Sequence, residues 1–120
     1  MKYIQYSIIK PLLQFFIKTK HPPHSYSPEL TQVIKDIVSL HVPAETTKIF
    51  LFGSRASGKN TKHSDYDIGI VANNPLSATT LREIQKEIGH IMTTQCHITD
   101  FTDAPEEEKQ RLITKKIIEI

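Results

Sequence analysis

Apolar residues after position 27 recur at helical spacing and predict the first helix of a folded domain. The apolar face comprises Leu30, Val33, Ile34, Ile37 and Val38. Ser27 offers a hydroxyl for the N-cap, and Pro28 suits the first helical position. The helix is therefore expected to begin after Ser27 and to end at or just before Pro43.

Three later segments carry the β-branched and aromatic residues typical of strands, and they are residues 46–52, 66–71 and 95–101. A helix capped by Ser77 or Thr79 is expected between the second and third strands, and a last helix opens at residues 103–106. Residues 116–120 fit either the end of that helix or a short edge strand. This order of elements, rich in isoleucine, predicts a core centred on a β-sheet.

Length, composition and charge narrow the class of protein. With 120 residues there is room for one domain and one hydrophobic core, and a single cysteine excludes a disulfide scaffold. Residues 1–20 contain four lysines and no acid, whereas residues 21–120 contain 11 basic and 13 acidic side chains. The net charge of +2 is therefore a property of one end of the chain, and it is weak evidence for nucleic-acid binding.

The N-terminal segment, residues 1–26, is predicted to be an extension and linker before a domain at residues 27–120. Two uncharged runs of seven residues flank Lys10, and neither approaches the ~20 apolar residues of a membrane span. A signal peptide or a membrane-surface helix fits less well than an appended helix or arm, because Lys10-Pro11 interrupts the apolar run. His21 and His24 are expected to be exposed loop histidines, since no third metal ligand lies near them.

Residues 53–60 nearly match a phosphate-binding P-loop, but two features contradict that interpretation. Asn60 stands where the P-loop has a hydroxyl residue that ligates Mg²⁺. A P-loop also leads directly into a long amphipathic helix, whereas here a turn and a strand follow.

A second pattern spans two strands: Gly53-Ser54, ten residues, Asp65, one residue, and Asp67. Residues two apart on a strand face the same side, so the two carboxylates are expected side by side. Adjacent carboxylates repel unless a cation lies between them, and Mg²⁺ or Mn²⁺ suits oxygen ligands. A short helix at 54–58 would offer free N–H groups to phosphate oxygens. The alternative is an ordinary polar hairpin with two surface aspartates.

Basic side chains near this pattern add to the expected phosphate site. Arg55, Lys59 and Lys62 lie on or near the loop and could neutralise the charge of a triphosphate. Together with Gly53 and Ser54, they predict a nucleotide-binding loop.

These residues carry a resemblance to a known family. The segments FLFGSRASG at 50–58 and SDYDIGIV at 64–71, with the weaker CHITDF at 96–101, resemble the minimal nucleotidyltransferases (MNT) of the DNA polymerase β-like superfamily. Proteins of this kind occur in HEPN/MNT toxin–antitoxin pairs. The resemblance covers about residues 27–120, and it implies an α+β (α/β) fold, a small mixed sheet flanked by helices, with the N-terminal arm added.

The resemblance implies a cytoplasmic, antitoxin-like enzyme that depends on Mg²⁺ or Mn²⁺. It would transfer a nucleoside monophosphate, AMP from ATP in the best-supported version, to a hydroxyl of a HEPN-type toxin partner. Asp65 and Asp67 would be catalytic and would hold the metals, while Gly53 and Ser54 would hold the β and γ phosphates.

The sequence departs from the family at the third carboxylate. The expected catalytic position falls on His97, and Asp100 matches a second acid that is usually not catalytic. The two residues are three apart and should face opposite sides of a regular strand. Two functions therefore remain: an enzyme with a weakened metal site, for which His97 is the third catalytic candidate, or a nucleotide- or partner-binding module without catalysis. The neighbouring Cys96 is expected to be a buried, inert thiol.

The matching domain of 94 residues leaves little room for a separate acceptor-binding domain. Recognition of the acceptor is therefore expected to come from a partner protein, from a second copy of the chain in a homodimer, or from the N-terminal arm. A nucleic-acid acceptor fits less well, because residues 21–120 carry a net charge of −2.

Overall fold

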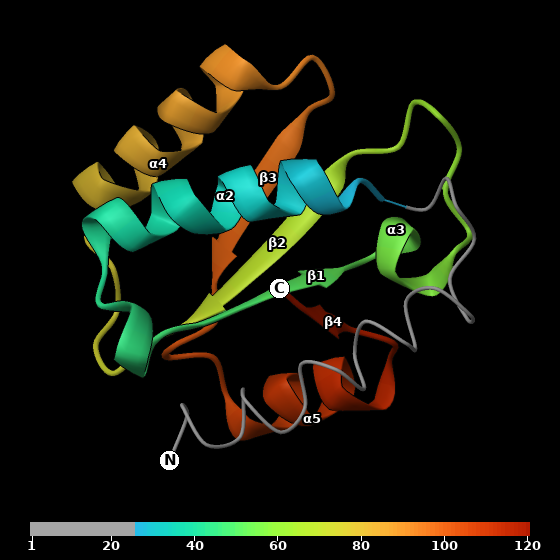
Figure 1. The fold of residues 1–120 in the computed structure, drawn as a ribbon. Helices are drawn as coiled ribbons and strands as arrows, with labels where there is room; N and C mark the ends of the chain where they lie inside the picture. Colours follow the sequence, from blue (N-terminus) through green and yellow to red (C-terminus); the bar gives the residue numbers. More distant parts are fainter. Residues whose placement is uncertain (1–25) are drawn as a thin grey trace.

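Four strands form one mixed sheet in the computed structural model, which describes residues 26–120 (Figure 1). The strands are β1 (Lys48–Phe52), β2 (Tyr66–Val71), β3 (Cys96–Asp100) and β4 (Ile118–Glu119). Their order across the sheet is β3-β2-β1-β4. β1 pairs antiparallel with β2 and with β4, whereas β2 and β3 run parallel. The predicted α+β class with a small mixed sheet is confirmed.

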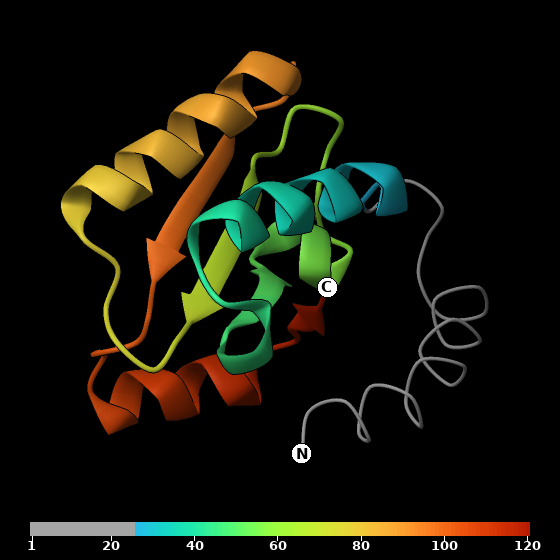
Figure 2. The ribbon, with the colours of Figure 1, turned by 60° about the vertical axis from the view of Figure 1, so that its left-hand side comes forward.

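Helices occupy both sides of this sheet. The helices α2 (Pro28–His41) and α4 (Ala78–Ile91) pack on each other and on one face, and α5 (Glu106–Thr114) lies apart from them near β4 (Figure 2). The short α3 (Ser54–Ser57) follows β1, and a 3-10 turn, η1 (Ala44–Thr46), precedes it. The predicted N-terminal arm lies outside the described residues, apart from Tyr26, whose side chain is buried.

The core fills the space between the sheet and the pair α2 and α4. Its largest fully buried side chains are Ile34, Val38, Leu51, Ile68, Ile70, Ile84 and Ile88. The N-cap of α2 forms as expected, because the Ser27 hydroxyl accepts a hydrogen bond from the Leu30 N–H. None of the helices in residues 26–120 is both long and apolar enough to cross a membrane.

The opposite face of the sheet carries the polar residues of the predicted motif and an aromatic cluster. Because strand residues alternate, Ile49 and Leu51 enter the core while Phe50 and Phe52 face the other way. The rings of Phe50, Phe52 and Phe101 meet there, with centroids 5.5 to 6.0 Å apart. A side chain at position 69 would collide with the Phe50 ring, so the cluster requires glycine there.

Element boundaries follow the sequence expectation with small differences. The first strand begins at Lys48 rather than at residue 46, because the 3-10 turn takes up residues 44–46. The last helix begins at Glu106, after Pro105 as its N-cap residue. Of the two structures expected for residues 116–120, the end of the helix or an edge strand, the edge strand is observed, since Ile118 and Glu119 pair with β1.

Candidate active site

Gly53 links the end of β1 to α3 and brings the backbone against a carboxylate. Its φ of 75° and ψ of −156° lie in a region that only glycine adopts readily. A Cβ at this position would collide with Oδ2 of Asp67. The glycine of the motif is therefore required by its conformation and by the close approach of Asp67.

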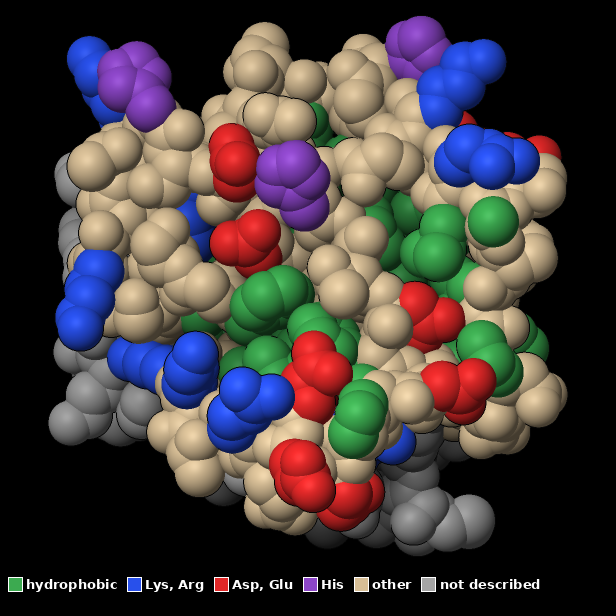
Figure 3. Space-filling model, turned by 180° about the vertical axis from the view of Figure 1, so that it is seen from behind, with side chains coloured by type: hydrophobic (Ala, Val, Ile, Leu, Met, Phe, Trp, Pro, Cys, Tyr) green, Lys and Arg blue, Asp and Glu red, His purple; other side chains and the backbone are tan. Residues whose placement is uncertain are grey.

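Asp65, Asp67 and His97 come together beside this loop. Asp67 on β2 lies opposite His97 on the parallel neighbour β3. The His97 Nε2 atom is 3.2 Å from Oδ2 of Asp65, and both side chains are about half exposed. Figure 3 shows acidic and histidine side chains side by side on this face. Two carboxylates and an imidazole thus meet at the end of the sheet where β1 ends.

The electrostatics of Asp67 suit a cation. Burial raises the pKa of Asp67, the nearby His97 opposes that shift, and the negative charge of Asp65 adds to it. The ionised pair is therefore unfavourable without a neighbouring positive charge. Within residues 26–120, no group of three His, Cys, Asp or Glu side chains is arranged to hold a metal ion alone. Two carboxylates that share a cation with substrate phosphates are nevertheless a common arrangement for Mg²⁺.

The loop after Gly53 has the short helix that the sequence predicts. The half-buried Ser54 opens it, and Gly58 ends it in the left-handed conformation with a φ of 78°. The Lys59 N–H closes the turn by donating to the Ser54 carbonyl at 3.0 Å. The Lys59 side chain is exposed, so it is free to approach an anion at this loop.

Arg55 lies differently from the expectation that it faces a nucleotide. Its side chain is only 6% exposed. Its guanidinium donates to the carbonyls of Ser64, at 3.0 Å, and Lys62, and lies 4.4 Å from the centroid of the Tyr66 ring. Arg55 therefore holds the segment that leads into Asp65, and its guanidinium contacts the protein's own backbone and the Tyr66 ring.

Asp100 is turned away from the acidic pair. Its carboxylate accepts hydrogen bonds from the Leu76 N–H at 2.8 Å and the Thr102 N–H at 2.9 Å. It thereby fixes the loops before α4 and after β3. His97 and Asp100 face opposite sides of a regular strand, as residues three apart should. His97, not Asp100, stands beside Asp65.

Cys96 is buried between the sheet and α4. Only 3% of its side chain is exposed, and burial, with smaller contributions from Asp67 and Asp65, raises the pKa of its thiol to about 12. A thiol with this pKa stays protonated at neutral pH and is a poor nucleophile. The structure agrees with the expectation of a buried, inert cysteine.

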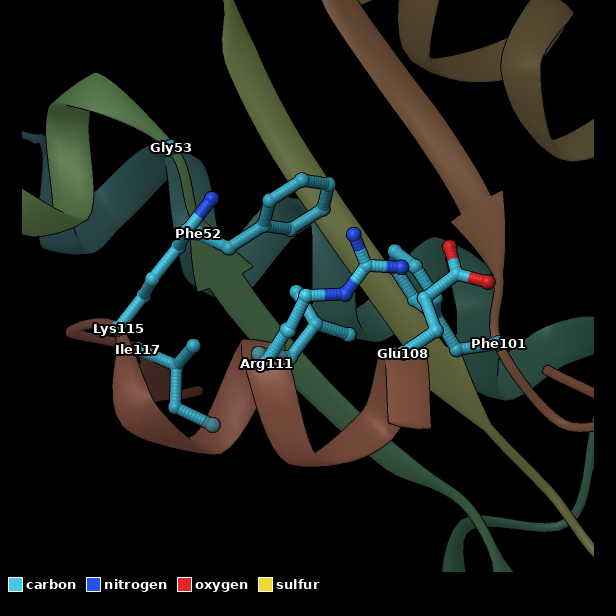
Figure 4. Close-up of a pocket in the computed structure, with 8 residues that line it drawn as sticks. Phe52, Gly53, Phe101, Glu108, Arg111, Lys115 and Ile117 are labelled. Atoms are coloured by element: carbon cyan, nitrogen blue, oxygen red, sulfur yellow. The ribbon is translucent and has the colours of Figure 1, made fainter. Parts of the chain in front are cut away.

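A cleft beside Gly53 was not anticipated from the sequence. It has a volume of about 390 Å³ and lies between the open face of the sheet and α5 (Figure 4). Its lining consists of Phe52, Gly53, Phe101, Glu108, Arg111, Leu112, Lys115 and Ile117. The sequence signal that could have indicated this cleft is the spacing of Arg111 and Lys115, which puts two cations on one side of a helical segment.

Solved structures with low sequence identity share this fold. A chain in the crystal structure of a toxin–antitoxin complex with AMP-PNP gives a TM-score of 0.62 at 21% identity, covering 75% of this chain and 70% of that one. A chain of a mutant MntA–HpeT toxin–antitoxin complex gives 0.58 at 20% identity, with coverages of 75% and 69%. A chain from a complex of a tri-AMPylated Shewanella oneidensis HEPN toxin with an MNT antitoxin gives 0.53 at 18% identity, with coverages of 73% and 69%.

Sequence comparison assigns the family. A search among curated proteins finds no match. The profile of the family described as Polymerase beta, Nucleotidyltransferase matches residues 32–119, which is most of the chain. This chain therefore belongs to the polymerase beta nucleotidyltransferase family.

Proposed function

We propose that this protein transfers AMP from ATP to a hydroxyl group of a HEPN-type partner, with Mg²⁺ or Mn²⁺ held by Asp65 and Asp67. The observation that carries the proposal is the meeting of these two carboxylates with the Gly53 loop at one end of the sheet. Membership of a nucleotidyltransferase family supports the reaction class. Structural neighbours that contain an ATP analogue and an AMPylated HEPN toxin support the nucleotide and the kind of acceptor.

The reaction follows from the chemistry of the site. The acceptor oxygen forms a bond to the α-phosphorus, the bond from that phosphorus to the bridging oxygen breaks, and pyrophosphate leaves. A divalent cation supplies charge stabilisation for the attacking and leaving oxygens when it is bound. Gly53 and Ser54 would contact the β and γ phosphates. His97, at 3.2 Å from Asp65, is our candidate to accept the hydroxyl proton.

A second function is favoured by one observation. Asp100 is bound to Leu76 and Thr102 and contributes no third carboxylate to the site. Neutral imidazole is a poorer partner for Mg²⁺ than a carboxylate. The alternative is therefore a module that binds the nucleotide or the partner without transferring a nucleotidyl group.

Incubation with labelled ATP, Mg²⁺ and the protein encoded next to this chain, tested as the candidate HEPN-type partner, separates the two functions. The proposal predicts label on the partner, lost in Asp65→Asn and retained in a control, Asp103→Asn, which changes an exposed acid outside the site. Absence of label with every NTP, together with intact partner binding, would contradict transfer and favour the binding module.

A further inference from the structure

The cleft beside α5 is continuous with the candidate active site. Gly53 lines the cleft, and the same residue lies directly against the carboxylate of Asp67. A ligand whose phosphates lie at the Gly53 loop can therefore also occupy the cleft. Figure 3 shows the acidic and histidine side chains next to exposed hydrophobic surface, with lysine and arginine side chains at its border.

The cations that face this open space come from the region of α5. Arg55 is buried against its own loop, so it is not available to a ligand in the cleft. The exposed side chains of Arg111 and Lys115 reach from the α5 side toward Phe52 and Phe101 (Figure 4). In the described part of the chain, neither cation lies within ion-pair distance of an acid. Their charge suits a ligand that is strongly negative, as a nucleoside triphosphate is.

The other lining residues suit a flat aromatic group. The half-buried Phe52 offers ring surface to the cleft, and the buried Phe101 supports it at a centroid distance of 5.5 Å. Nucleobases stack on aromatic rings and on guanidinium planes. The volume of about 390 Å³ lies within the range of small-ligand sites.

We propose that this cleft holds the nucleoside part of the NTP, with Phe52 and Arg111 against the base and Glu108 accepting a hydrogen bond from an exocyclic amino group. This inference rests on the proposed function, because it places the rest of the same substrate. A carboxylate accepts hydrogen bonds from the amino groups of adenine, guanine or cytosine, which uracil lacks. Lys115 adds positive charge near the phosphates. The cleft therefore makes α5 the element that selects the nucleotide.

Equilibrium binding of ATP and UTP to the full chain with Mg²⁺ tests the inference without an acceptor. Arg111→Ala is expected to weaken ATP binding about tenfold through lost stacking of the guanidinium on the base. Phe52→Leu keeps an apolar side chain in the aromatic cluster and is expected to weaken binding about fivefold through lost stacking. Glu108→Ala is expected to abolish the preference for ATP over UTP.

Neighbouring residues that do not line the cleft give matched controls. Lys116→Ala controls for the loss of a nearby positive charge, and Glu107→Ala controls for the loss of an acid in the same helical turn. Both are expected to bind ATP and UTP as the unaltered chain does. Unfolding temperatures of all variants show whether a binding loss reflects loss of the fold.

The outcomes separate this inference from the proposed function. If the unaltered chain binds no NTP, the proposed function fails and the inference fails with it. If the unaltered chain binds ATP and Asp65→Asn weakens that binding, but the cleft variants behave as their controls do, only the inference is overturned. Variants that bind ATP normally but lose transfer to the partner would assign the cleft to the acceptor and would also overturn it.

Discussion

Replacing Gly53 by alanine tests how the fold creates the site. The native backbone at this position has a φ of 75° and a ψ of −156°, which an alanine adopts only under strain. The added methyl group would also collide with Oδ2 of Asp67. The variant must therefore distort the loop, displace the carboxylate, or do both.

The losses of stability and of ATP affinity follow from the backbone strain at position 53 and from the displacement of Asp67. A residue held in such a backbone region costs about 1–3 kcal/mol. A loss of about 2 kcal/mol lowers the unfolding temperature of a domain of this size by roughly 8–16 °C. Because small domains are stable by about 5–15 kcal/mol, the variant should still fold. Displacement of Asp67 should weaken binding of ATP with Mg²⁺ by about tenfold or more, as loss of a supporting contact at a metal site does.

Thermal unfolding measures the loss of stability, and ATP titration of the same samples measures the loss of ATP affinity. Gly58→Ala is the matched control, because Gly58 also has a positive φ in this loop and ends α3. It should lose stability and keep its ATP affinity. Gly89→Ala in α4 should gain about 0.5–1 kcal/mol, since a Cβ there meets no atom within 4 Å. A Gly53→Ala chain with unchanged stability and unchanged ATP affinity would refute the reasoning.

Three further substitutions test the other parts of the site. Because burial raises the pKa of Asp67, its ionised form disfavours the folded state, and that penalty grows as the pH rises through the folded pKa. In EDTA at pH 7, Asp67→Asn should therefore raise the free energy of unfolding by on the order of 0.5 kcal/mol after solvent screening, and with it the unfolding temperature. The gain should vanish in acid, and a gain independent of pH would contradict this origin. Arg55→Met should lose about 2–3 kcal/mol in denaturant unfolding, because carbonyls including that of Ser64 lose a charged donor. Unchanged stability with weaker ATP binding would instead place Arg55 on the nucleotide. Asp100→Asn should lower stability by about 1–2 kcal/mol and leave Mn²⁺ binding unchanged, and weaker Mn²⁺ binding would show that Asp100 reaches the site.

Much of the fold could be predicted from the sequence because local signals and tertiary packing agree. Ser27 and Ser77 cap helices where the sequence places them, and the residues of β2 alternate between core and open face. The Gly53 motif and the two aspartates also meet as a strand pair predicts, because Phe52 lies opposite Asp67 in the register. These features depend on a few neighbouring residues or on one strand pairing.

The remaining features depend on contacts between distant segments. Nothing in the local sequence shows that Arg55 turns inward to Tyr66 and the carbonyl of Ser64, because a surface loop position is normally compatible with a free arginine. The cleft likewise depends on α5 lying across from Phe52. That position of α5 depends on how β3 and β4, the strands before and after it in the chain, pair in the sheet. Side-chain direction and the position of a helix over a sheet are properties of the assembled domain.

The position of the label in ATP gives the most direct test of nucleotidyl transfer. Parallel reactions contain the full chain, Mg²⁺, the proposed partner protein and ATP labelled with ³²P at either the α or the γ phosphate. The proposed reaction predicts that the α label stays on the partner and that the γ label leaves in pyrophosphate. Both labels should be absent from the partner with Asp65→Asn. Transfer of the γ label to the partner, or α label that persists with Asp65→Asn, would contradict a nucleotidyltransferase site built on Asp65 and Asp67.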